Sequence, residues 1–259
     1  MLELRNLRIT SGQKVLSDIP SLTVGPGERL GIVGESGSGK TLTVMSIVSL
    51  LPEGILATGQ VLFNGDDLLG MTERQLQDLR GRRIGVVFQD PGRALNPTMK
   101  IGRQLAEVLR IHGVSTARAD IRNRMLNLLA QVSLDGSAVI NRYPHELSGG
   151  QQQRVVIAIA MACGPDLLIA DEPTTALDVT VQKSILELLL DLCEHNNMGL
   201  IFVSHNLGVV QSICDRIAVM YQGALVEVGP AKEILRSPQE QYTRDLIAAS
   251  PSIPQAKGG

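Results

Sequence analysis

The fold is decided by residues 29–51, which read RLGIVGESGSGKTLTVMSIVSLL. Residues 29–33 form a short apolar run that is β-branched at its end, which is typical of a buried strand. Further along, apolar residues recur at helical spacing until Pro52, which ends the predicted helix. The residues between strand and helix, GESGSGKT, match the pattern G-x-x-x-x-G-K-[ST] of a phosphate-binding loop.

This loop contains the residue types that phosphate binding requires. Its glycines let backbone N–H groups turn inward around phosphates, and the following helix adds the positive end of its dipole. Lys40 would reach the β- and γ-phosphates of a nucleotide, and the Thr41 hydroxyl would ligate Mg²⁺. The predicted phosphate site consists of Gly34, Glu35, Ser36, Gly37, Ser38, Gly39, Lys40 and Thr41.

The composition is that of an ordinary folded protein and excludes several classes. Of the 259 residues, 44% are hydrophobic and 19% are charged, which excludes a disordered chain. The net charge is −2, so bulk charge gives no support for nucleic-acid binding. The longest apolar run, Val155–Cys163, is far shorter than a bilayer span, and no secretory signal follows Met1. We therefore expect a chain that is cytosolic or bound to a membrane through a partner.

The rest of the chain predicts an α/β fold with two additions. Residues 1–33 read as short strands and Asn64-Gly65 is a hairpin signal, so we expect an antiparallel β subdomain at the N-terminus. Residues 92–147 carry helical patterns and indicate a helical insert. From residue 150 helices alternate with buried strands, as expected for a parallel sheet covered on both faces. The predicted helices are 101–111, 121–132, 151–163 and 181–193, and the predicted strands include 84–88, 167–170 and 200–204.

Two carboxylates, Asp171 and Glu172, follow the apolar run at 167–170. An acid at the end of a buried parallel strand lies at the carboxyl edge of the sheet, where such sheets bind ligands. We expect Asp171 to hold Mg²⁺ through its waters and Glu172 to polarise the water that attacks the nucleotide.

Residues 147–151, Leu-Ser-Gly-Gly-Gln, open an apolar helix and allow two interpretations. Ser148, Gly149 and Gly150 would make an anion-facing helix N-terminus, yet a phosphate loop already exists at 34–41. A second such site needs a second nucleotide, or the nucleotide bound to another copy of the domain. The alternative is an ordinary helix N-cap, and the residue chemistry favours neither interpretation.

Taken together, these motifs resemble those of the nucleotide-binding subunit of an ATP-binding cassette (ABC) transporter. The resemblance covers about residues 1–248 and rests on the loop at 34–41, Gln89, Leu-Ser-Gly-Gly-Gln, Asp171-Glu172, Ala176-Leu177-Asp178 and His205. Residues 88–91, 95–97, 143–146 and 241–244 are similar to the peptide/nickel importer branch. The resemblance implies a P-loop NTPase with a RecA-like parallel core and the β subdomain at 1–91 and 150–248. It also implies a helical subdomain at 92–149 and a flexible tail at 249–259.

The same resemblance implies roles that residue chemistry alone does not assign. Two cassettes would form a head-to-tail dimer, in which ATP on one loop is completed by residues of the other cassette. Gln89 would contact Mg²⁺ and the attacking water, Asp178 would act across the dimer interface, and His205 would hydrogen-bond the γ-phosphate. The residues supplied to the other cassette would be Ser148, Gly149, Gly150 and Gln151.

The implied function is ATP hydrolysis that powers import of di- or oligopeptides at the cytoplasmic face of the inner membrane. The implied partners are a second, different cassette subunit, two membrane permeases and, indirectly, a substrate-binding protein; no nucleic acid is expected. Import of nickel or a metal chelate is the alternative within the branch. Two alternatives of other classes are a soluble ABC-type ATPase and a small-molecule kinase. The first usually needs two cassettes or a long coiled coil, and the second would not need Leu-Ser-Gly-Gly-Gln.

Several positions depart from the family pattern. Residue 206 is Asn where Asp is usual, and residues 240–241 are Glu-Gln where the branch often has His-Pro. A C-terminal Cys cluster found in longer members is also missing from this sequence. No aromatic residue precedes Phe63, and Ser11 stands about where the family stacks a ring on adenine. We therefore expect weak discrimination between ATP and GTP.

Overall fold

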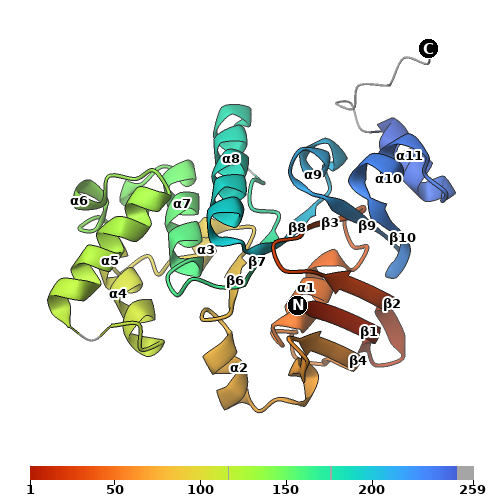
Figure 1. The fold of residues 1–259 in the computed structure, drawn as a ribbon, viewed down its shortest axis with the longest axis horizontal. Coiled ribbons are helices and arrows are strands. Elements are labelled where there is room, and N and C mark those ends of the chain that lie inside the picture. The colour runs from red at the N-terminus through yellow and green to blue at the C-terminus, as the bar shows by residue number, and fades with distance from the viewer. Residues whose placement is uncertain (116, 176, 250–259) are drawn as a thin grey trace. The chain divides into compact units, whose positions relative to one another are not determined.

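The computed structural model describes residues 1–115, 117–175 and 177–249 (Figure 1). These residues form two compact units. Unit 1 consists of residues 1–76 and the described residues from 199 onward, and unit 2 consists of the described residues of 77–198. The predicted tail at 249–259 lies outside the described residues, except for Ala249, which ends the last helix.

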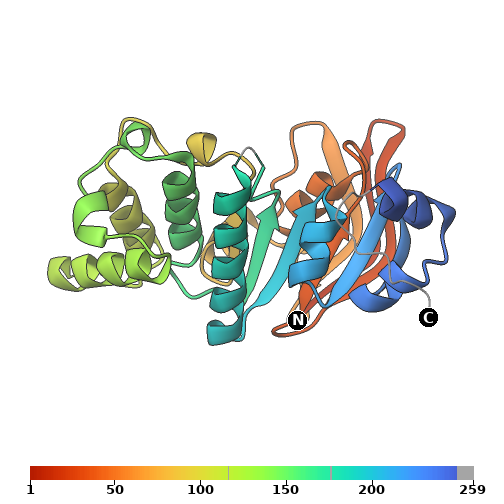
Figure 2. The same cartoon turned by 90° about the horizontal axis from the view of Figure 1, so that it is seen from above.

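Unit 1 contains a sheet in which antiparallel and parallel strands are joined. The strands lie in the order β5-β4-β1-β2-β10-β9-β3-β8, and Figure 2 shows the red N-terminal hairpin beside the blue strands β9 and β10. β1 pairs antiparallel with β2 and β4, whereas β3 pairs parallel with β8 and β9. The antiparallel N-terminal strands and the parallel pairing are thus as predicted. The bounds are β1 Leu2–Ser11, β2 Lys14–Val24, β3 Arg29–Val33, β4 Ile55–Phe63, β5 Asp66–Asp67, β8 Gly199–Ser204, β9 Arg216–Tyr221 and β10 Ala224–Pro230.

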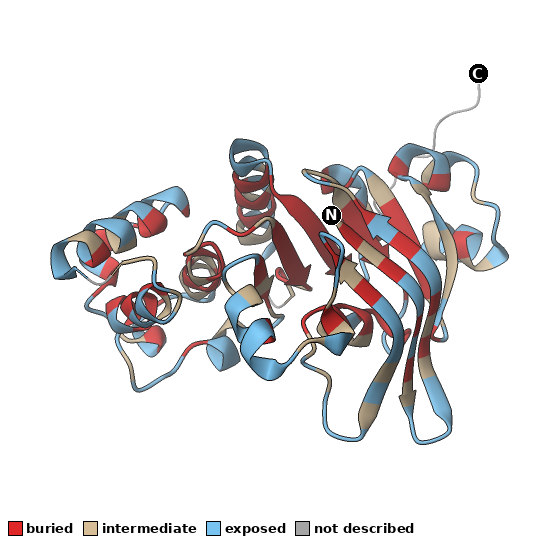
Figure 3. Ribbon diagram, turned by 60° about the horizontal axis from the view of Figure 1, so that its bottom comes forward, coloured by how far each residue is buried: buried red, intermediate tan, exposed pale blue. Residues whose placement is uncertain are grey.

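Burial along β1 alternates as expected for a strand with one buried face, but the alternation changes phase once. Figure 3 shows buried and exposed segments alternating along strands of the sheet. In β1, Leu2 and Leu4 are buried, and then Leu7 and Ile9 are buried, so that two exposed residues separate the pairs. The change coincides with Asn6, which has a φ of +46°, and with a register shift between β1 and β4. A bulge in β1 therefore keeps all four side chains on the buried face.

Helices α1, α9 and α10 of unit 1 pack against strands of this sheet. α9 packs on β3 and β8 at Gly31, where an added Cβ would lie 2.0 Å from Val210 Cγ1. α1 ends at Ile47, earlier than the predicted stop at Pro52, and Ser49 then takes a left-handed φ of +50°. The helices are α1 Lys40–Ile47, η1 Leu68–Gly70, α9 Leu207–Ile213, α10 Ala231–Arg236 and α11 Gln241–Ala249; α2, Glu73–Leu79, contains residues of both units.

Unit 2 consists of one parallel strand pair and a group of helices around α7. β6, Ile84–Val87, pairs parallel with β7, Leu167–Asp171, and α7 packs against β6, α3, α4, α5 and α8. The predicted helices and strands of this region are confirmed, although α7 ends three residues early and α8 is longer than expected. The helices are α3 Pro91–Ala94, α4 Ile101–Ile111, α5 Arg118–Gln131, α6 Gly136–Val139, η2 Pro144–Glu146, α7 Gly149–Ala160 and α8 Val179–Asn196.

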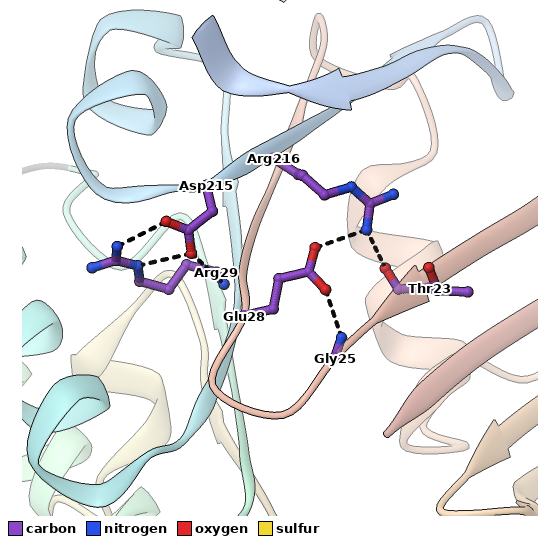
Figure 4. A network of polar contacts seen from close by, with 6 residues as sticks. All are labelled: Thr23, Gly25, Glu28, Arg29, Asp215 and Arg216. Carbon is purple, nitrogen blue, oxygen red and sulfur yellow. Dashed lines mark hydrogen bonds and ion pairs between the residues drawn. The ribbon is translucent and has the colours of Figure 1, made fainter.

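Two ion pairs join the start of β3 to the start of β9 (Figure 4). The Glu28 carboxylate accepts hydrogen bonds from the Gly25 N–H at 2.6 Å and from Arg216 Nη1 at 2.7 Å. Asp215 accepts from Arg29 Nη2 at 2.8 Å and from the Arg29 backbone N–H at 3.1 Å. The side-chain hydrogen bond from Arg29 is the main cause that lowers the pKa of Asp215 below its ordinary value. These contacts fix the strand that leads into the glycine-rich loop.

We predict that Asp215→Asn lowers the free energy of unfolding at neutral pH, because the amide loses the charge-assisted bond to Arg29. The loss should not exceed about 1 kcal/mol, since the Asp215 side chain is 47% exposed and water screens the pair. A lowered folded-state pKa means that the stabilisation is present above the ordinary value of 3.8 and is lost as the pH falls through the folded-state value. Urea unfolding of wild type and variant should therefore converge in acid. A stability difference that persists unchanged below the folded-state pKa would contradict this assignment.

Candidate nucleotide-binding residues

The loop between β3 and α1 has a shape that only glycine permits at three positions. Gly34, Gly37 and Gly39 have φ values of +153°, +80° and +97°. A Cβ on Gly34 would lie 2.1 Å from the Met220 carbonyl oxygen, and one on Gly39 would lie 2.9 Å from that of Leu16. Gly37 has open space beside it, so its requirement is conformational alone. The predicted loop therefore curls against the backbone of two neighbouring strands.

Lys40 begins α1 and places its ammonium group inside the loop. The side chain is only 5% exposed, and Nζ donates to the carbonyl oxygens of Gly34 at 2.9 Å and Glu35 at 2.7 Å. The next residue, Thr41, is exposed on the first turn of α1. A cation held inside a curled backbone, at a helix N-terminus, is the arrangement that binds phosphate oxygens.

Two further contacts support this loop, and sequence reasoning missed both of them. Thr43 is fully buried, donates from Oγ1 to the Gly39 carbonyl oxygen at 3.0 Å, and has its Oγ1 3.0 Å from Ser17 Oγ of β2. The Gly223 N–H, in the turn between β9 and β10, donates to the Ser38 carbonyl oxygen at 3.2 Å. The loop and the helix that follows it are thereby attached to β2 and to the turn between β9 and β10.

His205 leaves the same edge of the sheet as the loop, as predicted. Val33 at the end of β3 pairs in register with Ser204 at the end of β8, so that Gly34 and His205 follow at equivalent positions. His205 is exposed, and Asn206 caps α9 by accepting from the Val209 N–H at 3.3 Å. Asparagine at 206 is thus explained as a helix N-cap, a role for which Asn and Asp are equally suited.

In unit 2, the carboxylates at the end of β7 meet a glutamine from the end of β6. Val87 pairs with Ala170, so Gln89 and Glu172 leave the same edge, and Gln89 Nε2 donates to Glu172 Oε2 at 3.2 Å. Thr175 Oγ1 donates to the same oxygen at 2.9 Å, a contact that sequence reasoning missed. Two donors thus orient the Glu172 carboxylate. The Glu172 backbone has a left-handed φ of +46°. The preceding residue, Asp171, is buried.

The N-termini of α7 and α8 lie against each other and are both capped by side chains. Ser148 Oγ accepts from the Gln151 N–H at 3.3 Å, and Gln151 Oε1 accepts from the Ser148 N–H at 3.1 Å, which forms a capping box. Asp178 Oδ1 accepts from the N–H groups of Thr180 and Val181. The N-cap interpretation is therefore confirmed for Ser148, and Asp178 is found to cap α8 in the same way. Any role of either residue toward another cassette is additional. Ala176, quoted with Asp178, lies outside the described residues.

The candidate residues thus fall into three groups. In unit 1 the loop at 34–41 and His205 share one edge of the sheet; in unit 2 Gln89, Asp171 and Glu172 form one group, and the caps at 148–151 and 178 form another.

Among the residues that the structure describes, none of the helices has the length and apolar character needed to span a membrane.

Known proteins are similar to this chain in sequence over most of its length. The ABC transporter family matches residues 17–175. The oligopeptide transport ATP-binding protein OppD of Bacillus subtilis is 49% identical over 88% of this chain and 64% of its own length, so the chain spans less than two thirds of that relative. OppD of Lactococcus lactis subsp. cremoris is 45% identical over 93% of this chain and 71% of its own length. This chain belongs to the ABC transporter family.

A solved structure shows the same fold. A dimeric, post-hydrolysis state of the ATP-binding cassette MJ0796, bound to ADP and Pi, has a TM-score of 0.77 and 28% identity over 89% of this chain and 99% of that chain. The predicted fold class, a P-loop NTPase of the α/β type, is therefore confirmed.

The two glycines that open α7 should respond differently to alanine. A Cβ on Gly150 would lie 2.6 Å from Val181 Cγ1, whereas one on Gly149 would lie 3.6 Å from Leu177 Cδ2, an ordinary contact. We expect Gly150→Ala to lower the free energy of unfolding by about 1–3 kcal/mol. Gly149→Ala should leave it unchanged or raise it by up to about 1 kcal/mol. Val181→Ala should recover part of the Gly150→Ala loss. Equal losses in the two single variants, measured by chemical denaturation, would contradict the packing described here.

Proposed function

We propose that this chain is the ATP-hydrolysing subunit of a peptide importer, bound to partner permeases at the cytoplasmic face of the inner membrane. The observation that carries the proposal is the Lys40 ammonium group, which the carbonyl oxygens of Gly34 and Glu35 hold inside a glycine-dependent loop. Phosphate oxygens would take over these contacts when ATP binds, and the buried position of Lys40 would strengthen the attraction.

The nucleotide would be bound as its Mg²⁺ complex. The residues proposed to hold the ion are Thr41, Gln89 and Asp171, which offer hydroxyl, amide and carboxylate oxygens, the donors that Mg²⁺ prefers. Gln89 fits this role because its Nε2 group donates to Glu172, so its amide oxygen is the atom suited to a cation. The ion would neutralise charge on the phosphates. The loop residues Gly34, Glu35, Ser36, Gly37, Ser38, Gly39, Lys40 and Thr41 would surround the phosphates themselves.

Hydrolysis would depend on Glu172, Gln89 and His205. Glu172 would accept a hydrogen bond from the attacking water and polarise it, and its orientation is supported by Gln89 and Thr175. Gln89 would contact the same water. His205 would hydrogen-bond the γ-phosphate, in keeping with its position at the edge of the sheet that the loop also leaves.

Two cassettes would act together, head to tail. Ser148, Gly149, Gly150 and Gln151 open a capped helix whose N-terminus would face the nucleotide of the other cassette, with Asp178 at the interface. The dimeric state of the MJ0796 cassette bound to ADP and Pi supports this proposal. We propose that the partner is a second, different cassette subunit.

The functional division of this chain would be a nucleotide-binding core with its β subdomain at 1–91 and 150–248, and a helical subdomain at 92–149.

The proposed cargo is di- or oligopeptides. Relatives in two organisms are named oligopeptide transport ATP-binding proteins, and they support this substrate class over nickel or a metal chelate. The remaining partners would be two membrane permeases and, indirectly, a substrate-binding protein. Purification of the assembled complex, followed by identification of the ligand on that binding protein, tests the substrate. A bound nickel chelate instead of peptide would overturn it.

Two variants should separate nucleotide binding from hydrolysis. Lys40→Ala removes charge-assisted contacts to the phosphates and should weaken ATP binding by about tenfold to a hundredfold. Glu172→Gln keeps the phosphate contacts and should retain ATP binding, while turnover falls by about 10²- to 10⁴-fold because the water is no longer polarised. Binding is measured by titration calorimetry and turnover by phosphate release from the assembled complex. Near-normal hydrolysis by Glu172→Gln would remove Glu172 from its proposed role.

Ser148→Arg tests whether the α7 N-terminus serves another cassette. Because the damaged residue would act on the partner's nucleotide, the isolated variant should bind ATP as wild type does. The assembled complex should lose hydrolysis. If the isolated variant instead loses ATP affinity as severely as Lys40→Ala, the head-to-tail arrangement is wrong.

A further inference from the structure

The C-terminal helix α11 contacts the phosphate-binding loop through Tyr242. The backbone N–H of Glu35, the second residue of the loop, donates to the Tyr242 hydroxyl at 3.0 Å, across 207 positions of the sequence. Burial is the main cause that raises the pKa of Tyr242, so the hydroxyl is protonated and neutral at physiological pH. It therefore offers Glu35 a neutral acceptor that does not add negative charge beside the loop.

The ring of Tyr242 is held in place by a second aromatic ring. It stacks on Tyr221, at the end of β9, with 4.1 Å between ring centroids and an angle of 29° between the planes. Tyr221 lies between two residues that contact the loop. The carbonyl oxygen of Met220, in β9, lies against Gly34, and the N–H of Gly223, in the turn after β9, donates to Ser38. The stack thus holds the Tyr242 ring beside the end of β9.

The start of α11 has its own attachment to the sheet. The Glu227 carboxylate of β10 accepts from the N–H groups of Gln239 at 2.8 Å and Glu240 at 3.3 Å. Arg244 donates to the carbonyl oxygens of Pro238 at 2.9 Å and Gln239 at 3.1 Å. Because these contacts do not involve the Tyr242 hydroxyl, its removal should leave α11 in position.

The peptide units of residues 34 and 35 are therefore held from two directions. Lys40 Nζ binds the carbonyl oxygens of Gly34 and Glu35, and Tyr242 binds the N–H of Glu35. If Lys40 turns to phosphate oxygens when nucleotide binds, those carbonyls lose a donor, while the bond to Tyr242 can persist. The hydroxyl would then matter more in the nucleotide-bound loop than in the empty one.

We infer that Tyr242 is a positioning residue for the nucleotide, acting through the Glu35 peptide to keep the first turn of the loop in its phosphate-binding shape. This inference rests on the proposed function of residues 34–41. It makes α11 part of the nucleotide site, although the helix is remote from the loop in sequence. Loss of one such hydrogen bond should raise the dissociation constant for ATP about threefold to tenfold. The effect should be equal for GTP, because the loop faces the phosphates and not the base.

The test compares Tyr242→Phe with Tyr221→Phe in the full chain. Both variants keep the stacked rings and lose one hydroxyl, but the Tyr221 hydroxyl accepts from Gln222 Nε2 and not from the loop. We expect Tyr242→Phe to raise the dissociation constants for ATP and GTP by the same factor, with an unchanged melting temperature. The Glu35 amide should exchange faster with solvent in this variant. Tyr221→Phe should behave as wild type in all three measurements.

Three outcomes would overturn the inference. Wild-type affinity and wild-type Glu35 exchange in Tyr242→Phe would show that the hydroxyl does not position the loop. Equal weakening in both variants would assign the effect to the stacked rings and not to the hydroxyl. Lys40→Ala, run alongside, separates the inference from the function on which it rests. If Lys40→Ala binds ATP normally, the proposed phosphate site fails and the inference with it; if Lys40→Ala loses binding while Tyr242→Phe does not, only the inference fails.

Discussion

The constraint on which unit 1 depends is the close approach of a glycine-rich backbone to the ends of two strands. The carbonyl oxygens of Met220 and Leu16 occupy the places where side chains at residues 34 and 39 would lie. This contact lets the loop curl tightly enough for the Lys40 ammonium to reach the carbonyls at its start. The positions of β2, β9 and α1 are all tied to it. The loop is therefore a packed part of the sheet and not a flexible connection between β3 and α1.

Much of the fold and of the site could be predicted because the signals are local. The glycine spacing at 34–39 and the apolar runs at β3, β7 and β8 each occupy a few consecutive residues. Gln89 is different: a glutamine after an apolar strand carries no signal of its own, and only the family resemblance assigns it a role. The in-register pairing of β6 and β7 is what brings it to Glu172. The geometry shows that Ser148 caps α7, but its role toward another cassette stays a proposal, since a capping box and an anion-facing helix end have the same sequence.

The contacts that escaped prediction depend on tertiary structure. Nothing near Glu35 indicates that a tyrosine about two hundred residues away will accept its N–H, and the short helices α9, α10 and α11 carry too few turns for a clear periodic pattern. The end of α1 was missed for a related reason. Val48 and Leu51 continue the helical spacing, yet Ser49 turns the backbone into the left-handed region. Thr175 lies three residues from Glu172, and its contact requires the turn that follows β7.

The left-handed backbone at Glu172 affects which amino acids evolution would favour at this position. A non-glycine residue in the left-handed region costs about 1 kcal/mol or more, and glutamate has no local compensation of the kind that asparagine or glycine offers there. The backbone of the residue to which we assign a role in hydrolysis therefore carries a conformational cost that glycine would avoid at this position. A copy of this gene released from selection for activity would gain stability by replacing Glu172 with glycine or asparagine. Under the role proposed for Glu172, glutamate at this position would serve activity and not folding.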